Sequence, residues 1–337
     1  MRASGSRLSP ASKTPVVVNA SRLDSGAKNR IFCEAISPYL SRPPPVATTT
    51  LAKYTDLTQM KKMSLYQTTL KNRAIVRVSG SQREAFLQNL LTQNVNARDT
   101  QNCQMAALLT PQGKLAYDFL VFTEDDSFLL DCDAAIAEDL AKKLNMYKLR
   151  ADVDISLSDM RSVAIWQEDG YPCPSALGFV TDPRHEGLGL RGVFDTAPTL
   201  SLPEGEFEDW RHNRIRLGVA EGADEMPPAS IFPLEFGLAE MAGVDFKKGC
   251  FIGQEVTSRT HRKGQLRKKL WPISFADKAP ERGTAITDGQ RQCGEIMSCS
   301  KTHALALIRE DAALENLLCD GKSFTRLPGV FGEGEAP

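Results

Sequence analysis

Short apolar stretches separated by polar and glycine-containing segments recur along the first part of the chain, from about residue 70 to residue 160. Such stretches bounded by turn residues predict strands, and apolar positions three or four residues apart predict helices. Strands are predicted at 74–78, 105–109, 114–122, 128–131 and 153–157. Helices are predicted at 81–92, where Ser81 and Glu84 match a capping box, and at 134–149. The order β-α-β-β-β-α-β is close to the split βαβ arrangement of ferredoxin-like domains.

The second part of the chain shows weaker periodicity, followed by a run of short strands. A strand is predicted at 163–166 and helices at 207–217 and 234–241. Four more strands, separated by glycine-containing turns, are predicted at 270–275, 285–287, 294–299 and 304–308. Because these strands follow one another without a helix, they predict a small β-barrel or sandwich.

Residues 1–62 differ from the rest in composition. They are rich in Ser, Pro and Thr, and they carry ten Lys and Arg against three Asp and Glu, a net charge of +7. Without a sustained amphipathic period, this segment is predicted to be disordered. It is interpreted either as an organelle transit peptide or as a non-native extension before a true start at Met60 or Met63. The second interpretation is slightly favoured.

Composition excludes several broad classes of protein. The 337 residues are 42% apolar and 25% charged with a net charge of −1, which is typical of soluble proteins and argues against a generally nucleic-acid-coating protein. No apolar run approaches the length of a membrane span. The eight cysteines show no CxxC spacing, so no zinc site, no self-contained iron–sulfur site and no other metal site is predicted. Unpatterned cysteines in a long chain indicate a reducing compartment.

Residues 247–256, KKGCFIGQEV, gather reactive, cationic and small residues where a core element would show apolar periodicity. Lys247 and Lys248 precede Cys250, and nearby cations lower the pKa of a thiol. Gln254 and Glu255 offer a donor and an acceptor to a heterocycle with amide-like edges, such as a pterin. The simpler interpretation is a tight turn with a buried cysteine and a solvated basic face.

Two further groups are candidates for a binding cavity. Asp118 is an acid in an apolar strand that follows the turn at Gly113, although alternation favours a solvent-facing position. Trp210 and Arg214 are suited to stack on a flat ring, and the carboxylate of Glu235 is suited to hydrogen-bond to the amino–imino edge of a pterin. The simpler interpretation is that Trp210 packs its helix and that Glu235 lies on the surface at the start of a helix. The basic run 259–269 is either a solvated strand end or a contact for phosphate, polyglutamate or RNA.

The stretch KGCFIGQE, residues 248–255, resembles the signature of the YgfZ-type folate-binding proteins. These are iron–sulfur cluster assembly factors related to the T-protein, the aminomethyltransferase of the glycine cleavage system. The resemblance extends in order over about 70–330, through Phe86-Leu87-Gln88, Gly113-Lys114 with Asp118, Arg214-Ile215 with Gly218, Pro233 with Glu235, and the Gly264 to Lys268 turn.

The resemblance implies the fold. An α+β protein is expected, with a T-protein-like ring of three subdomains that combines ferredoxin-like βαββαβ units and a small C-terminal β-barrel. The expected divisions are an extension at 1–62, a ferredoxin-like subdomain at 63–160, a second α+β subdomain with the signature at 161–262, and a barrel with its tail at 263–337.

The resemblance also implies the function. A tetrahydrofolate-binding accessory factor is expected, which assembles or repairs 4Fe–4S proteins, including radical enzymes that thiomethylate tRNA. Cys250 is the expected functional thiol. Residues expected to shape the folate site are Lys248, Gln254, Glu255, Arg259, Asp118, Trp210, Arg214 and Glu235. The expected partners are folate, iron–sulfur client proteins and the assembly machinery, with a possible tRNA contact and no membrane. The protein is expected to be a monomer. Its expected location is the cytoplasm, or the mitochondrial matrix if 1–62 is a transit peptide.

Two alternatives from other classes remain open. A folate-dependent aminomethyltransferase or demethylase would use Asp118, but the T-protein relatives carry two adjacent acids where this chain has Tyr117 and Asp118. That difference weakens the enzyme hypothesis and favours an accessory factor. A tRNA-binding module would instead use the basic run at 259–269.

Overall fold

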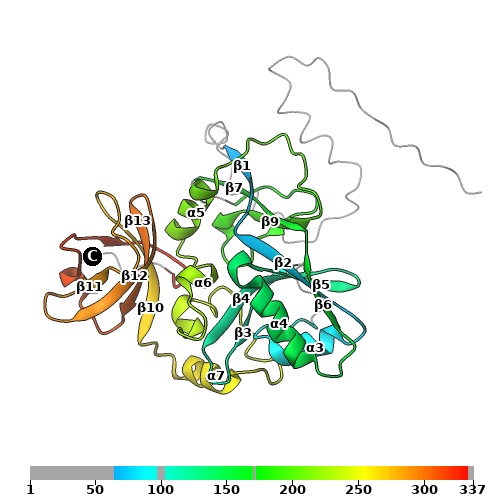
Figure 1. Ribbon diagram of the computed structural model, residues 1–337. Helices are drawn as coiled ribbons and strands as arrows, with labels where there is room; N and C mark the ends of the chain where they lie inside the picture. The colour runs from blue at the N-terminus through cyan, green and yellow to red at the C-terminus, as the bar shows by residue number, and fades with distance from the viewer. Residues whose placement is uncertain (1–63, 97–102, 169, 171, 333–337) are drawn as a thin grey trace, which may run out of the picture. The chain divides into compact units, whose positions relative to one another are not determined.

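The computed structural model describes residues 64–96, 103–168, 170 and 172–332. The chain divides into two compact units, Met1–Lys62 and Met63–Pro337. The predictions for residues 1–62 lie outside the described residues. The described residues of the second unit form three sheets, and Figure 1 colours their strands from blue toward the N-terminus to red toward the C-terminus.

The first sheet has five antiparallel strands in the order β3-β4-β5-β2-β6. Its elements are β2 (Arg73–Ser79), α3 (Arg83–Leu90), β3 (Cys103–Leu109), β4 (Leu115–Thr123), β5 (Ser127–Asp133), η2 (Ala134–Ile136), α4 (Ala137–Lys148) and β6 (Asp154–Ser158). The predicted order of elements is confirmed. When the edge strand β3 is left aside, the remaining strands lie side by side in the order β6-β2-β5-β4. Along the chain these are the fourth, first, third and second of the four strands, which is the ferredoxin-like order.

The predicted capping box at the start of α3 is wrong. The helix begins at Arg83, and no side chain caps its N-terminus. Ser81 instead donates from its hydroxyl to Asp152 at 2.5 Å, in the loop before β6. A contact distant in sequence therefore replaces the local cap.

The second sheet has the order β1-β7-β9-β8 and includes the first described strand of the chain. Its strands and the elements around them are β1 (Leu65–Thr69), β7 (Arg161–Gln167), β8 (Val180–Thr181), η3 (Glu186–Leu188), β9 (Leu190–Phe194), α5 (Phe207–Arg216), α6 (Gly222–Glu225) and η4 (Pro233–Phe236). The predicted strand at 163–166 and helix at 207–217 are confirmed. The helix predicted at 234–241 is wrong, because η4 ends after one turn at Gly237, which adopts a left-handed conformation with φ of 77°.

The third sheet is C-terminal and has the order β14-β11-β12-β13-β10-β15. Its elements are α7 (Gln254–Lys263), which precedes it, β10 (Lys268–Ser274), β11 (Ala285–Thr287), β12 (Gln292–Ser300), β13 (His303–Arg309), η5 (Leu314–Asn316), β14 (Leu318–Cys319) and β15 (Thr325–Arg326). All four strands predicted in this region are present.

Both faces of the five-stranded sheet are buried, and one face belongs to a core shared by all three sheets. Val76 and Val78 of β2 pack toward α3 and α4. Ile75 points to the other face, into a cluster that also contains Phe236 of η4 and Leu270 of β10. This shared core holds η4 and the chain around α7 in place.

Candidate functional site

The signature stretch forms a loop that leads into α7, and two glycines fix its position. Gly253 caps α7 in a left-handed conformation, with φ of 77°. A Cβ on Gly253 would lie 2.5 Å from the carbonyl oxygen of Thr110, and one on Gly113 would lie 2.7 Å from Cβ of Val256. The turn between β3 and β4 therefore packs directly against the start of α7, and both positions require glycine.

Lys248 anchors the same loop to the chain after α3. Its ammonium group donates to the carbonyl oxygens of Leu91 and Gln93, both at 2.7 Å. Burial lowers the pKa of Lys248 to about 8, which the nearby Asp245 carboxylate partly opposes. The side chain predicted to shape a ligand site is instead used to hold the loop.

Cys250 lies exposed between these two anchors. The other described cysteines are buried or partly buried: Cys103, Cys132, Cys173, Cys293, Cys299 and Cys319. Phe251 is buried and fixes the loop to the shared core. The described residues contain no group of three His, Cys, Asp or Glu side chains placed to hold a metal ion. The loop thus presents a single thiol between contacts that hold the chain on both sides.

The polar residues of α7 form a surface with contacts among themselves. Glu255 accepts from Arg259 one turn later at 2.8 Å, and both side chains are largely exposed. His261 stacks on Phe246, with ring centroids 3.7 Å apart. Gln254 is half-buried at the start of the helix. Exposed pairs of this kind contribute little to stability, so these charges remain available to a partner.

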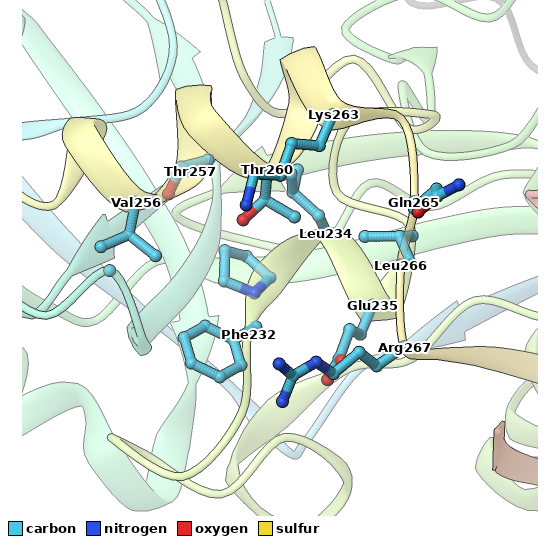
Figure 2. Close-up of a pocket in the computed structure, with 12 residues that line it drawn as sticks. Phe232, Leu234, Glu235, Val256, Thr257, Thr260, Lys263, Gln265, Leu266 and Arg267 are labelled. Atoms are coloured by element: carbon cyan, nitrogen blue, oxygen red, sulfur yellow. The ribbon is translucent and has the colours of Figure 1, made fainter. Parts of the chain in front are cut away.

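A cavity of about 340 Å³ lies between η4, α7 and the segment that follows α7. Its apolar lining includes Phe232 and Leu266, and its charged lining consists of Glu235, Lys263 and Arg267. Figure 2 shows the carboxylate of Glu235 beside Arg267. Burial raises the pKa of Glu235, although the Lys268 backbone N–H and the Lys268 and Arg267 charges oppose this shift. The cavity therefore combines apolar walls with one acid and two bases.

The other three predicted cavity residues lie in a buried ionic network rather than in this cavity. Arg214 donates twice to Glu225, both at 2.7 Å. Trp210 is 1% exposed, and the guanidinium of Arg214 lies 5.9 Å from its ring centroid. Asp118 is also buried, and burial raises its pKa to about 6 despite the nearby Arg73. The structure does not bring these three residues to Glu235 or Cys250.

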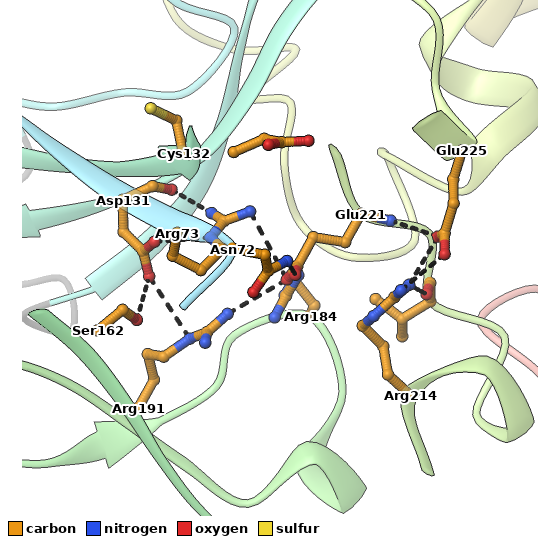
Figure 3. A network of polar contacts seen from close by, with 12 residues as sticks. Asn72, Arg73, Asp131, Cys132, Ser162, Arg184, Arg191, Arg214, Glu221 and Glu225 are labelled. Atoms are coloured by element: carbon orange, nitrogen blue, oxygen red, sulfur yellow. Dashed lines mark hydrogen bonds and ion pairs between the residues drawn. The ribbon is translucent and has the colours of Figure 1, made fainter. Parts of the chain in front are cut away.

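The centre of this network is Glu221, which was not among the residues predicted from the sequence. Its carboxylate accepts from Arg184 at 2.6 Å and from Arg191 at 3.2 Å, and it lies 3.7 Å from Arg73. Figure 3 shows these side chains converging from separate elements. The opposite charges lower the pKa of Glu221 well below its usual range, in spite of complete burial. The sequence feature that could have indicated this network is a charged residue within an apolar strand, such as Arg191 in β9.

Comparisons with known proteins identify the family. The human protein named iron-sulfur cluster assembly factor IBA57, mitochondrial, is 32% identical over 271 residues, which cover 71% of this chain and 76% of that protein. This chain belongs to the IBA57-type family. The Mycosarcoma maydis protein named as the mitochondrial IBA57 homolog is 35% identical over 224 residues, which cover 60% of this chain and 56% of that protein.

Two further comparisons concern the fold. The family model described as CAF17, C-terminal beta-barrel domain, matches residues 267–328. The crystal structure of glycine cleavage system aminomethyltransferase T from Bartonella henselae matches with a TM-score of 0.53 at 10% identity, covering 73% of this chain and 78% of that one. The predicted T-protein-like fold with a C-terminal β-barrel is confirmed. The finer YgfZ-type assignment stays a prediction.

None of the described helices combines the length and apolar character needed to cross a membrane.

Proposed function

We propose that this chain is an accessory factor in the assembly or repair of 4Fe–4S proteins in the mitochondrial matrix, with Cys250 as its functional thiol. Its human and mouse relatives are named iron-sulfur cluster assembly factors and mitochondrial. The observation that carries the proposal is the exposure of Cys250 on a loop held by Lys248 and Gly253. Because of these names, the proposal places the chain in the mitochondrial matrix rather than in the cytoplasm.

A single thiol is suited to work on a cluster that another molecule also holds. Thiolate-bound iron–sulfur clusters take four cysteine ligands. The described part of this chain offers Cys250 without a nearby set of further metal ligands. A cluster in contact with Cys250 would therefore share its remaining ligands with a second molecule, as expected for a factor that serves client proteins.

Loss of this chain from cells tests the assembly role. We expect the activities of a 4Fe–4S aconitase-type dehydratase and of tRNA thiomethylation to fall, because both depend on completed clusters. A dehydrogenase without a cluster should keep its activity and serves as the control. Unchanged aconitase activity would contradict the assembly role, whereas loss of aconitase alone would remove only the tRNA-modifying enzymes from the clients.

We also propose tetrahydrofolate as a ligand, with its ring at Glu235. A carboxylate is suited to accept from the amino and imino groups of a pterin, and Phe232 and Leu266 supply apolar walls. Lys263 and Arg267 are suited to the carboxylates of the glutamate tail. The volume of about 340 Å³ lies at the lower end of the range for small-molecule sites, which fits the ring with the tail outside.

Replacing Glu235 by glutamine is expected to weaken tetrahydrofolate binding by about tenfold or more, because a charge-assisted hydrogen bond is lost. Glu240→Gln is the matched control, because burial also raises the pKa of Glu240 while that residue does not line the cavity. Binding is measured by equilibrium dialysis under anaerobic conditions. Equal affinities of the Glu235→Gln variant and the unmodified protein would contradict the assignment of this cavity to folate.

The enzyme alternative has less support from the surroundings of Asp118. An aminomethyltransferase or demethylase would need this carboxyl group at its substrate. Asp118 is 3% exposed, accepts from the backbone N–H of Gly222 and does not line the cavity at Glu235. Its place in the network favours a structural role, and hence an accessory factor over a folate-dependent transferase.

A further inference from the structure

Two neighbouring elements of the first sheet, α4 and β6, leave several apolar side chains exposed close together. Six large apolar side chains are exposed in the part of the chain that the structure describes, and three of them lie within 146–157: Met146, Leu149 and Leu157. Met146 and Leu157 line an open groove of about 640 Å³, whose other lining residues also belong to α4. Single exposed apolar residues need no explanation, but a cluster of them marks an interaction surface.

Leu149, the residue that ends α4, is not explained by the structure of the chain itself. Its φ of 47° lies in the left-handed region, where glycine is favoured. Its side chain is 86% exposed, so internal packing does not require leucine either. Among the described residues other than glycine that have a positive φ, it alone carries a large apolar side chain. A contact from outside the chain accounts for leucine at this position.

Strand β6 is also an open edge of the five-stranded sheet. It pairs with β2 alone, in a regular antiparallel register. At the opposite edge, Thr92 covers β3, because its backbone N–H donates to the carbonyl oxygen of Ala107 and its hydroxyl accepts from the N–H of Ala107. Among the described residues, no backbone group of Asp154–Ser158 has a comparable bond outside the ladder with β2. An open edge without proline or a bulge is suited to pair with another strand.

The groove beside β6 favours an uncharged occupant. Its charged lining consists of one acid, Glu138, and one base, Lys142, so the lining is neutral overall. These two side chains lie on successive turns of α4, with 3.4 Å between Nζ of Lys142 and a carboxylate oxygen of Glu138. A strongly acidic or basic segment would gain no counter-charge here, whereas aliphatic side chains would cover Met146 and Leu157.

The sequence of β6, Asp-Ile-Ser-Leu-Ser, is complementary to itself. When two copies of the strand run antiparallel about Ser156, Ile155 of one copy lies opposite Leu157 of the other. Asp154 then lies opposite Ser158. Apolar side chains face apolar ones, polar side chains face polar ones, and no like charges meet directly across the pair. The strand that fits this edge is therefore β6 of a second copy.

We propose that Met146, Leu149, Leu157 and the outer edge of β6 form the surface on which a second copy of this chain docks. An antiparallel β6–β6 pair then joins the two five-stranded sheets into one. A two-fold axis at Ser156 relates the copies, as in the common isologous dimer. The pair satisfies the open backbone groups of both edges and buries the exposed apolar side chains of both copies. The inference is independent of the role in cluster assembly, and it replaces the expectation of a monomer.

Sedimentation velocity of the purified chain, over about a hundredfold range of concentration, tests the self-association. We expect a shift from monomer to dimer as the concentration rises. Leu157→Lys should raise the dissociation constant by at least about tenfold, because it places a charge against apolar side chains of the second copy. Leu177→Lys makes the same change at a 99% exposed position in another loop and should leave the dimer unchanged. Met146→Lys, at a 68% exposed position, should repeat the loss if Leu157→Lys lowers the melting temperature.

A disulfide between the copies tests the register of the pair. Ser156 would lie opposite Ser156 of the second copy, and opposite residues of antiparallel strands have Cα atoms within the span of a disulfide. Ser156→Cys, combined with Cys250→Ala to remove the exposed thiol, should form a covalent dimer under mild oxidation. Asp154→Cys in the same background is the control. It should stay monomeric on a denaturing gel, because its two copies would lie about 13 Å apart along the strands.

Three results would overturn the inference. The first is a chain that sediments as a monomer at every concentration, and the second is a dimer that neither Leu157→Lys nor Met146→Lys weakens. The third is equal cross-linking of Ser156→Cys and Asp154→Cys, which would exclude the two-fold strand pair. If the chain is monomeric and Leu157→Lys, unlike Leu177→Lys, fails to rescue aconitase activity in cells lacking the chain, a segment of another protein occupies the groove in place of a second copy.

Discussion

Replacing Glu221 by glutamine is expected to lower the free energy of unfolding by about 3–5 kcal/mol, because it removes a buried negative charge that three guanidinium groups share and leaves them only the carboxylates of Asp131 and Asp182. Arg184 and Arg191 donate to this carboxylate, and Arg73 lies 3.7 Å away. The amide of glutamine is neutral and replaces one acceptor by a donor. The measurement is the midpoint of urea unfolding at neutral pH, with an unchanged slope as the sign that only stability has changed.

Asp118→Asn is the matched control, because Asp118 is also buried but its pKa is shifted in the opposite direction. Burial raises the pKa of Asp118 to about 6, whereas the surrounding arginines keep that of Glu221 well below its usual range. Above pH 6 the charged form of Asp118 is therefore penalised in the folded protein, and its neutral form becomes favoured as the pH falls through 6. Asn should be neutral or stabilising at pH 7.5, with a smaller advantage at pH 5.

The two variants together test the account of the network. Comparable destabilisation by Glu221→Gln and Asp118→Asn at pH 7.5 would show that the network depends on shape rather than on paired charge. Stability of Glu221→Gln within about 0.5 kcal/mol of the unmodified chain, the usual range for surface substitutions, would contradict the assignment of Glu221 as its centre.

Replacing Cys250 by alanine is expected to abolish the function in cluster assembly while leaving the fold intact. Cys250 is exposed, so its side chain contributes little packing to the core. Under the proposed function the Cys250 thiolate bonds to iron, so its loss removes that bond, and we expect the activity of 4Fe–4S clients to fall by more than about tenfold. Cys173→Ala is the control, because Cys173 is partly buried and donates to the carbonyl oxygen of Ile165 at 3.5 Å.

Much of the fold could be predicted because short apolar runs and helical spacing mark the buried elements. Apolar runs indicated β2, β3, β4 and β5, whose sheet is buried on both faces, and the run of short strands indicated the C-terminal barrel. The predicted start of α3 and the predicted length of η4 were wrong, each for a different reason. Ser81 has a partner in Asp152, about 70 residues later, and Gly237 ends η4 through its backbone conformation. The distant partner of Ser81 leaves no local pattern. Gly237 is a local stop signal, but the apolar residues on both sides of it favoured a longer helix.

The candidate site was predictable only where local sequence carries the chemistry. The signature marked the loop with Cys250, and two of its residues, Lys248 and Gly253, hold that loop. The ionic network was missed because Glu221 obtains its partners from strands and loops far apart in the chain. The cavity at Glu235 depends on the packing of η4 against α7, which sequence alone does not specify.

The central claim is that the exposed thiol of Cys250 serves cluster assembly. Its most direct test is aconitase activity in cells lacking this chain, after expression of the full-length unmodified chain or its Cys250→Ala variant at equal abundance. The account predicts that the unmodified chain and the Cys173→Ala control restore the activity and that Cys250→Ala does not. Full restoration by Cys250→Ala would contradict the claim and move the functional site to the cavity at Glu235.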